Sequence, residues 1–394
     1  MWYEDVSSLP STIYGEDDVR TARGFFADLF REAELAPDPP NPSDKSPNLV
    51  CLNWWSSGLG PLTQTIYLAR TLFRLRRNVT RRSVPIFRGK VRELLKLRGA
   101  SLEELLAELR IGAMLTERFS PIALEPMVPE ELIASPAVPR SPDFGIRLPD
   151  GDVFLEATVL RIDPLDKQGK ALSELRRRLL ASLKRTGRFG RLHLSVGFSV
   201  SHQDVSHIVQ AVSAYLSAPP ANTLADRRLD IAGIGDVQIS WQPIPHFDSL
   251  AELERSGTYR GIATFGAGGS QARAVECAVE PSVLRQFEPQ MAKSLRNTLN
   301  GKRRQAPNGG RYCVILALGN HLLSGDGILA RVESELVRSQ NFHFLSAVGV
   351  FRPRCNFESH PDGERLSFAL NPNAKSAVGK PFEAAIAGPG CHLP

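Results

Sequence analysis

The sequence lacks the residue clusters that mark several common classes of site. Its five cysteines are widely spread and form no CxxC pair, which argues against a zinc site or a disulfide framework and for a reducing compartment. The eight histidines contain no HExxH or HxxxH pattern, so a histidine-built metal site is not expected. The glycine-rich stretch 266–270 has neither the Lys-Ser/Thr of a P-loop nor GxGxxG spacing, which predicts a turn.

Long apolar segments are also missing. No run of 18 uncharged apolar residues occurs, and no apolar segment follows Met1. We therefore expect neither a membrane-spanning nor a secreted protein, and we expect a cytoplasmic one. The 394 residues, 42% of them hydrophobic, suffice for a sizeable core and predict two modules. A net charge of +6 favours an anionic partner.

Residues 141–160 form the stretch around which the chain is organised. Pro142-Asp143 opens one predicted strand, turn residues follow, and 152–160 alternate as a second strand, which together predict a hairpin. The hairpin brings Asp143 near Glu156, and two carboxylates placed together usually need a cation between them. The alternative is that both acids are simply solvated.

A charged residue interrupts the apolar face of two predicted helices. In the helix expected at 102–119, with Ser101 as N-cap and Glu104 completing a capping box, Glu108 falls on the apolar arc. An acid there is costly to bury without a partner. In the helix expected at 282–305, Lys302 lies within the apolar arc and Gln305 at its edge. The alternative for Lys302 is a lysine that reaches water from a helix end.

Residues 70–98 carry almost only positive charge. The side chains that best suit contact with a phosphate backbone are Arg74, Arg76, Arg77, Arg81 and Arg82. The alternative is a solvated helix face.

The remaining pattern predicts an α/β protein. Strands are expected at 122–128, 192–200, 229–243, 261–265, 312–318 and 344–351, and further helices at 17–35, 170–185, 204–216 and 327–339. The predicted organisation is an N-terminal extension with a Pro-rich linker (1–48), a basic helical region (49–100), a core in two parts (101–160 and 281–355), an insertion (161–280) and a tail (356–394).

The order of helix with Glu108, strand, strand with Pro-Asp143 and strand with Glu156-Ala-Thr158 resembles the PD-(D/E)xK, or restriction-endonuclease-like, nuclease superfamily. The resemblance covers about 60 residues and implies a mixed central sheet flanked by helices. It departs from the family at one position, because Thr158 stands where the lysine of ExK is expected. In some members that lysine has moved to the later helix, where this chain has Lys302.

The resemblance implies a nuclease that uses Mg²⁺ or Mn²⁺, with DNA as the expected substrate and a role in bacterial defence as a further expectation. Asp143, Glu156 and the carbonyl of Ala157 would hold the ion, and Glu108 would hold a second ion directly or through water. Lys302, with Gln305 beside it, would orient the attacking water or stabilise the phosphoryl charge, which Thr158 cannot do. Two alternatives stay open: a nucleic-acid-binding or assembly module that has lost catalysis, and an unrelated α/β protein in which Glu108 and Lys302 are chance intrusions.

Overall fold

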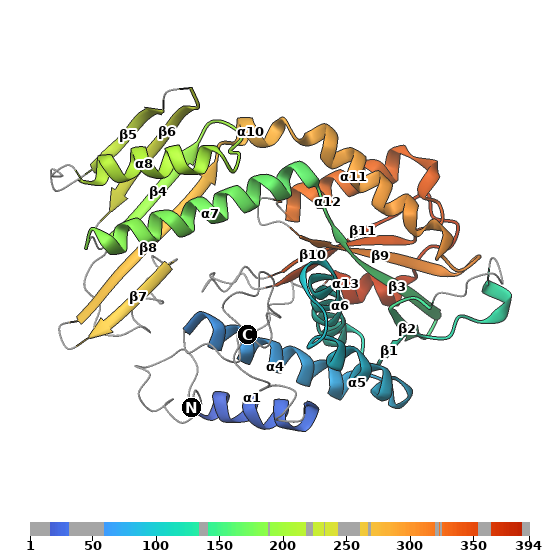
Figure 1. The fold of residues 1–394 in the computed structure, drawn as a ribbon. Coiled ribbons are helices and arrows are strands. Elements are labelled where there is room, and N and C mark those ends of the chain that lie inside the picture. The colour runs from blue at the N-terminus through green and yellow to red at the C-terminus, as the bar shows by residue number, and fades with distance from the viewer. Residues whose placement is uncertain are drawn as a thin grey trace.

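The fold comes from a computed structural model, which describes residues 16–30, 59–133, 141–187, 190–217, 224–231, 233–242, 261–266, 269–319, 323, 325–353 and 364–387. The architecture is α/β, as the sequence predicts, with two mixed sheets flanked by helices (Figure 1). The predicted Pro-rich linker and the end of the predicted tail from residue 388 lie outside the described residues.

The first sheet has six strands in the order β1-β2-β3-β9-β10-β11. They are β1 (Ile122–Leu124), β2 (Phe144–Leu148), β3 (Gly151–Leu160), β9 (Arg311–Leu318), β10 (Ala347–Arg352) and β11 (Arg365–Leu370). The predicted hairpin is confirmed as β2 and β3, with Phe144 opposite Leu155 and a turn that ends at Gly151, whose φ of 127° favours glycine. β3, β9 and β10 pair in parallel, and the outer pairs are antiparallel.

The central strand β9 is buried on both faces, and its side chains alternate between two hydrophobic clusters. Residues such as Ile315 face the helices α1 (Glu16–Leu29), α4 (Leu59–Asn78), α5 (Val84–Glu93), α6 (Gly99–Arg118) and α13 (Lys380–Ile386). Residues such as Val314 face α11 (Glu288–Gly301) and α12 (Gly325–Arg338). The first sheet is therefore the middle layer of three.

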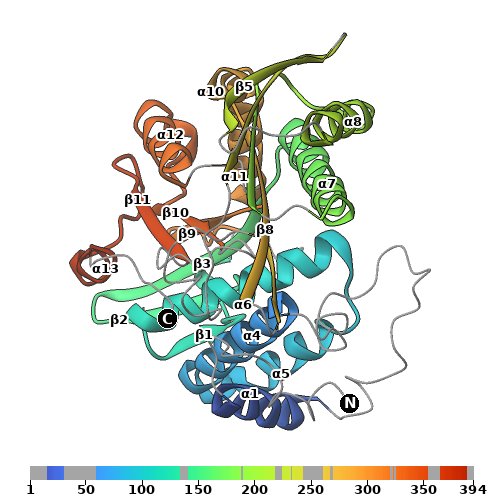
Figure 2. The ribbon, with the colours of Figure 1, turned by 90° about the vertical axis from the view of Figure 1, so that its left-hand side faces the viewer.

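The second sheet is formed entirely by residues that lie between β3 and β9 in the chain. Its order is β5-β6-β4-β8-β7, with β4 (Gly190–Val196), β5 (Leu224–Ile231), β6 (Gly235–Gln242), β7 (Gly261–Gly266) and β8 (Gly269–Val279). Two helices, α7 (Asp163–Arg185) and α8 (Asp204–Ser217), lie together on one side of it (Figure 2). The short helix α10 (Pro281–Arg285) leads from this sheet back to α11.

Short 3-10 turns complete the connections: η2 (Arg81–Ser83), η3 (Glu130–Leu132), η4 (Lys302–Arg304) and η5 (Gln340–Phe342). Within the ranges that the structure describes, no helix combines the length and the apolar character needed to cross a membrane.

Several predicted elements are confirmed, and several details are wrong. The helices expected at 204–216 and 327–339 are present as α8 and α12, and the turn expected at 266–270 joins β7 to β8, with Gly266 opposite Gly269. The single strand expected at 229–243 is instead a hairpin of β5 and β6. Gly233 (φ 77°) and Gly235 (φ 135°) permit the chain reversal between them.

Two further errors concern helices: a break within one and the start of another. The helix expected at 282–305 is broken into α10 and α11, because Pro289 has no backbone N–H and cannot donate the helical hydrogen bond to the carbonyl of Arg285. Ser101 is not an N-cap, since α6 already begins at Gly99. Glu104 is engaged instead by Arg161, whose Nη2 lies 3.6 Å from its Oε1 and also donates to the carbonyl of Ala100.

Candidate active site

The predicted hairpin places two acids close together in the first sheet. Asp143 directly precedes β2, and its Oδ2 accepts a 2.7 Å hydrogen bond from the backbone N–H of Ala157 in β3. Glu156, the neighbouring residue of β3, is nearly buried. The backbone of β3 thus fixes the carboxylate of Asp143, which precedes β2.

Lys302 reaches this pair from a distant part of the chain. It is the C-cap of α11 and the first residue of η4, and its Nζ lies 2.9 Å from Glu156 Oε1. The two residues are 146 positions apart in the sequence. The sequence prediction that Lys302 points inward is correct, although the residue lies in a 3-10 turn and not within a continuous helix.

Glu108 completes the predicted set from α6, where it meets a lysine that the sequence analysis did not single out. Lys90 Nζ, from α5, lies 2.9 Å from Glu108 Oε1 and 2.6 Å from Glu125 Oε1. We define the acidic cluster as Glu108, Glu125, Asp143 and Glu156. Within it, Lys90 lies between two acids and Lys302 contacts a third.

Glu125, which follows β1, has an unusual backbone for its residue type. Its φ is 44°, in the left-handed region that non-glycine residues seldom adopt. Its N–H donates a 3.0 Å hydrogen bond to the carbonyl of Asp143. This bond ties the position of Glu125 directly to that of Asp143.

Burial, followed by repulsion between the acids, dominates the electrostatics of the acidic cluster. Burial, reinforced by the charges of Glu156 and Glu108, raises the pKa of Asp143 to about 8. Burial also raises the pKa of Glu108, against the opposing effect of Lys90. The acids therefore lie within electrostatic range of one another. If Glu108 and Lys302 were chance intrusions, they would be expected to lie far from Asp143 and Glu156. Both lie close to these acids instead.

Tyr312 is a further residue that the sequence analysis missed. Its side chain is fully buried in β9, and burial together with the charges of Glu156 and Asp143 raises the pKa of its hydroxyl. Among the described residues this hydroxyl has no hydrogen-bond partner. A buried, unsatisfied donor close to acids is costly in a purely structural core.

Thr158 and Gln305, the two remaining predicted catalytic residues, lie close in the sequence to Glu156 and Lys302, respectively. Thr158 is half-buried in β3, two residues beyond Glu156. Gln305 follows η4, and its backbone N–H donates to the carbonyl of Lys302. Gln305 therefore helps to end the turn that carries the lysine.

The donor chemistry of the acidic cluster fits a hard divalent cation, since all of its side-chain donors are carboxylate oxygens. In the described part of the chain, however, no three Asp, Glu, His or Cys side chains are drawn together as a ready metal cage. Lysine ammonium groups instead lie against Glu108, Glu125 and Glu156.

The five predicted nucleic-acid-binding arginines fall into two groups. Arg74 forms an ion pair with Glu117, and the guanidinium groups of Arg76 and Arg77 lie 6.0 Å and 5.4 Å from the ring centroids of Phe25 and Phe73, respectively. Arg74 and Arg76 therefore join α4 to α6 and to α1, whereas Arg77 contacts a ring of its own helix. The other two, in η2, are exposed: Arg81 and Arg82.

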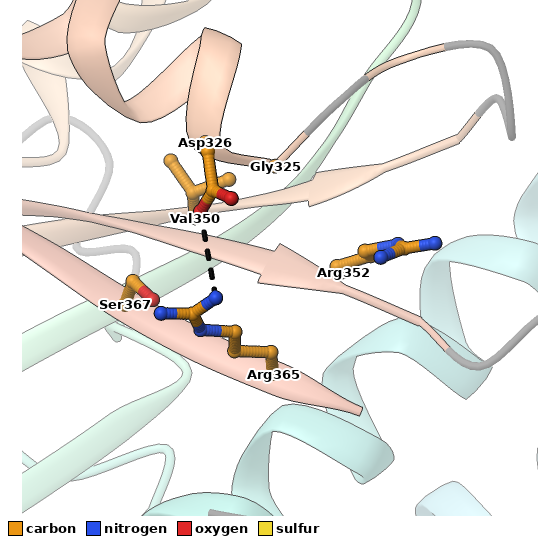
Figure 3. A pocket seen from close by; sticks show the side chains of 6 residues that line it. All are labelled: Gly325, Asp326, Val350, Arg352, Arg365 and Ser367. Atoms are coloured by element: carbon orange, nitrogen blue, oxygen red, sulfur yellow. Dashed lines mark ion pairs between the residues drawn. The ribbon is translucent and has the colours of Figure 1, made fainter. Parts of the chain in front are cut away.

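A separate polar pocket of about 50 Å³ lies at the N-terminus of α12, beside β10 and β11. Its lining is Gly325, Asp326, Val350, Arg352, Arg365 and Ser367 (Figure 3). Arg365 Nη1 lies 3.5 Å from Asp326 Oδ1, whereas Arg352 extends away from that pair (Figure 3). The pocket includes no member of the acidic cluster, so it is a distinct feature.

A second buried ion pair, outside the acidic cluster, joins Arg110 of α6 to Glu364, just before β11. The side chain of Glu364 is fully buried, and the guanidinium carbon of Arg110 lies 5.2 Å from the centroid of the Tyr67 ring. This pair fixes α6 only two residues beyond Glu108.

Comparison of the chain with family models, with curated proteins and with solved structures finds no match.

Proposed function

We propose that the chain is a divalent-metal-dependent nuclease with a restriction-endonuclease-like core, acting on DNA. The observation that carries the proposal is the meeting of Asp143, Glu156 and Lys302 at one end of the β2–β3 hairpin. The resemblance in the sequence requires such a meeting, although the lysine is 146 positions from Glu156.

The order of elements supports the same proposal. Helix α6, the antiparallel strands β1, β2 and β3, helix α11 and the parallel strand β9 follow one another in the order that the resemblance implies. On this interpretation the second sheet is the insertion between the third strand and the closing helix.

Each residue has a distinct task in hydrolysis. Asp143 and Glu156 would hold the cation, with the carbonyl of Ala157 completing the protein's share of the ligands. A bound Mg²⁺ or Mn²⁺ would lower the pKa of a water molecule and relieve charge on the phosphoryl oxygens. Lys302, already in contact with Glu156, would orient that water or stabilise the charge of the transition state.

The raised pKa of Asp143 has a consequence for this chemistry. At neutral pH a carboxyl group with a pKa near 8 retains its proton for much of the time in the metal-free protein. Because the ion needs the ionised form, its binding releases that proton and tightens as the pH rises.

The exposed Arg81 and Arg82 suit contact with the DNA backbone. Both lie in η2, and α5, which carries Lys90, follows directly at Val84. Phosphate contacts from arginine position a duplex without reading its sequence, and they weaken as salt concentration rises.

The experiment is a cleavage assay with single- and double-stranded DNA and RNA, in Mg²⁺ or Mn²⁺. Asp143→Ala and Lys302→Ala should each lower the rate by about 10²-fold or more. Matched controls come from the same elements: Asp152→Ala in the hairpin and Lys293→Ala in α11 replace exposed residues and should retain the wild-type rate.

A second candidate function is a nucleic-acid-binding or assembly module without catalysis. The observation that favours it is that Lys90 and Lys302 already pair with three of the four acids, while Thr158 replaces the usual lysine. Salt-sensitive DNA binding without cleavage of any substrate would select this function and reject the nuclease.

A further inference from the structure

Lys90 occupies part of the space in which the resemblance would put a second metal ion. Its side chain is only 13% exposed, and its Nζ lies within 3 Å of one oxygen each of Glu108 and Glu125. It lies on the same side of α5 as the buried residues Phe87 and Leu94, which are three positions before it and four after it. The lysine therefore points into the protein and not towards solvent.

The surroundings hold Lys90 in place through short backbone connections. Leu124 N donates a buried 2.9 Å hydrogen bond to Ser83 Oγ, and Thr80 N donates to the carbonyl of Ile122. These bonds tie the start of α5, the helix that carries Lys90, to β1, the strand that precedes Glu125.

Glu125 supports the same interpretation by its backbone. A left-handed conformation at a non-glycine residue costs on the order of 1 kcal/mol, and such residues gather at functional sites. At Glu125 this conformation accompanies a carboxylate 2.6 Å from Lys90 Nζ and an N–H bound to the carbonyl of Asp143.

Charge balance indicates how many ions the site can hold. Metal binding requires ionised carboxylates, and four of these with two lysine ammonium groups leave two negative charges in the acidic cluster. One divalent cation neutralises that charge, whereas a second would leave the partly buried group with two positive charges. Burying such an excess is unfavourable.

We propose that Lys90 acts as a built-in cation on the Glu108 side of the acidic cluster, so that the site takes up one divalent ion, at Asp143 and Glu156, and not two. This inference rests on the proposed function and replaces the expectation that Glu108 holds a second ion. Lys90 is then a positioning residue, which keeps Glu108 and Glu125 paired while the ion binds beside them.

The test counts bound Mn²⁺ by electron paramagnetic resonance, with isothermal titration calorimetry as a second measurement. The wild-type chain should bind one Mn²⁺. Lys90→Met keeps the length of the side chain and removes its charge, and it should bind two, or bind a second ion at least about tenfold more tightly. Lys90→Arg restores the charge and should bind one. The matched control Arg92→Met, at an exposed position of α5, should behave as wild type.

A further variant does not depend on the folding of Lys90→Met. Glu108→Gln should still bind one ion, with an affinity within about threefold of wild type, since Glu108 is not a ligand of that ion. Two ions bound by the wild type, a single ion with unchanged affinity in folded Lys90→Met, or loss of the ion in folded Glu108→Gln would each overturn the inference and leave the nuclease proposal standing. Absence of any binding, in wild type and variants alike, would overturn both.

Discussion

The two sheets have a similar architecture but bury different kinds of side chain. Each is a mixed sheet with helices packed against it, yet buried charge gathers only around the first among the described residues, at Glu156 and Glu364. The second sheet and its helices bury Gln168 and Ser182, which are uncharged. A stable sheet in this chain thus needs no buried charge, so the acids of the first sheet call for an explanation other than stability.

The difference is also visible in single strands. Strand β4 of the second sheet alternates buried and half-buried residues, as expected for a sheet with one well-packed face. In β3, by contrast, four consecutive residues are buried, and the last of them is Glu156. A buried acid in such a position needs a partner of opposite charge, and Glu156 has one in Lys302.

The largest expected effect comes from removing buried charge on one side only. Arg110→Ala leaves Glu364 buried without its partner, and it should lower the free energy of unfolding by about 3–5 kcal/mol. Urea denaturation measures the loss. The double variant Arg110→Met/Glu364→Leu should recover most of it. A loss below about 1 kcal/mol in the single variant would mean that burying this charge costs little, which would weaken the contrast between the sheets.

A cavity in the second sheet should affect stability without affecting the acidic cluster. Leu194→Ala, at a fully buried position of β4, should cost about 2–5 kcal/mol, while Leu194→Met should cost less than about 1.5 kcal/mol. Below the melting temperature, the affinity for Mn²⁺ should equal that of wild type. A parallel loss of ion binding would show that the sheets are not independent in this respect.

Removing one of the repelling acids should stabilise the metal-free protein. The pKa of Asp143 is about 8 in the folded chain and about 3.9 when unfolded, so the folded state binds this proton more tightly. Its contribution to stability is therefore lost as the pH rises from about 4 to 8. Asp143→Asn should be more stable than wild type by about 2–4 kcal/mol at pH 8, with little difference at pH 4.

Thermal unfolding across that pH range, with a chelator present, measures this effect. Asp152→Asn, at an exposed position of the same hairpin, is the control and should show no such pH dependence. Equal stabilities of Asp143→Asn and wild type at pH 8 would argue that burial and the neighbouring acids do not raise the pKa of Asp143 appreciably.

The smallest effect is expected from a surface ion pair beside the second sheet. Hydrogen bonds from Arg177 and Arg178 lower the pKa of Glu174 to about 2, but the group lies on the outside of α7, where water screens it. Glu174→Gln should change the free energy of unfolding by no more than about 0.5 kcal/mol in urea denaturation. A change above about 1 kcal/mol would show that charged groups beside the second sheet also contribute to stability, which would weaken the contrast between the two sheets.

The local elements and two inward charges could be predicted from the sequence. Glu108 and Lys302 were found because each interrupts an apolar face. The same test applied to residues 84–94 would have found Lys90, which shares its side of the helix with Phe87 and Leu94. The dense positive charge around it indicated phosphate contact instead.

Other features had no local signal. The left-handed backbone of Glu125 depends on its bond to Asp143, which lies beyond the following loop. The pairing of β3 with β9 joins strands separated by the entire second sheet, and nearest-neighbour patterns do not report such contacts. The break before Pro289 and the β5–β6 turn could be predicted from the sequence, because proline and glycine both mark chain breaks.

The pairing of β3 with β9 also bears on the order in which the protein matures. Contacts between distant parts of a chain form slowly, because a long loop must close before they contribute. During synthesis, Glu156 and its hairpin emerge long before Lys302 and β9, with the whole second sheet between them. We therefore expect the acidic cluster to be assembled last, so that a growing chain carries its four acids and Lys90 before Lys302 reaches Glu156.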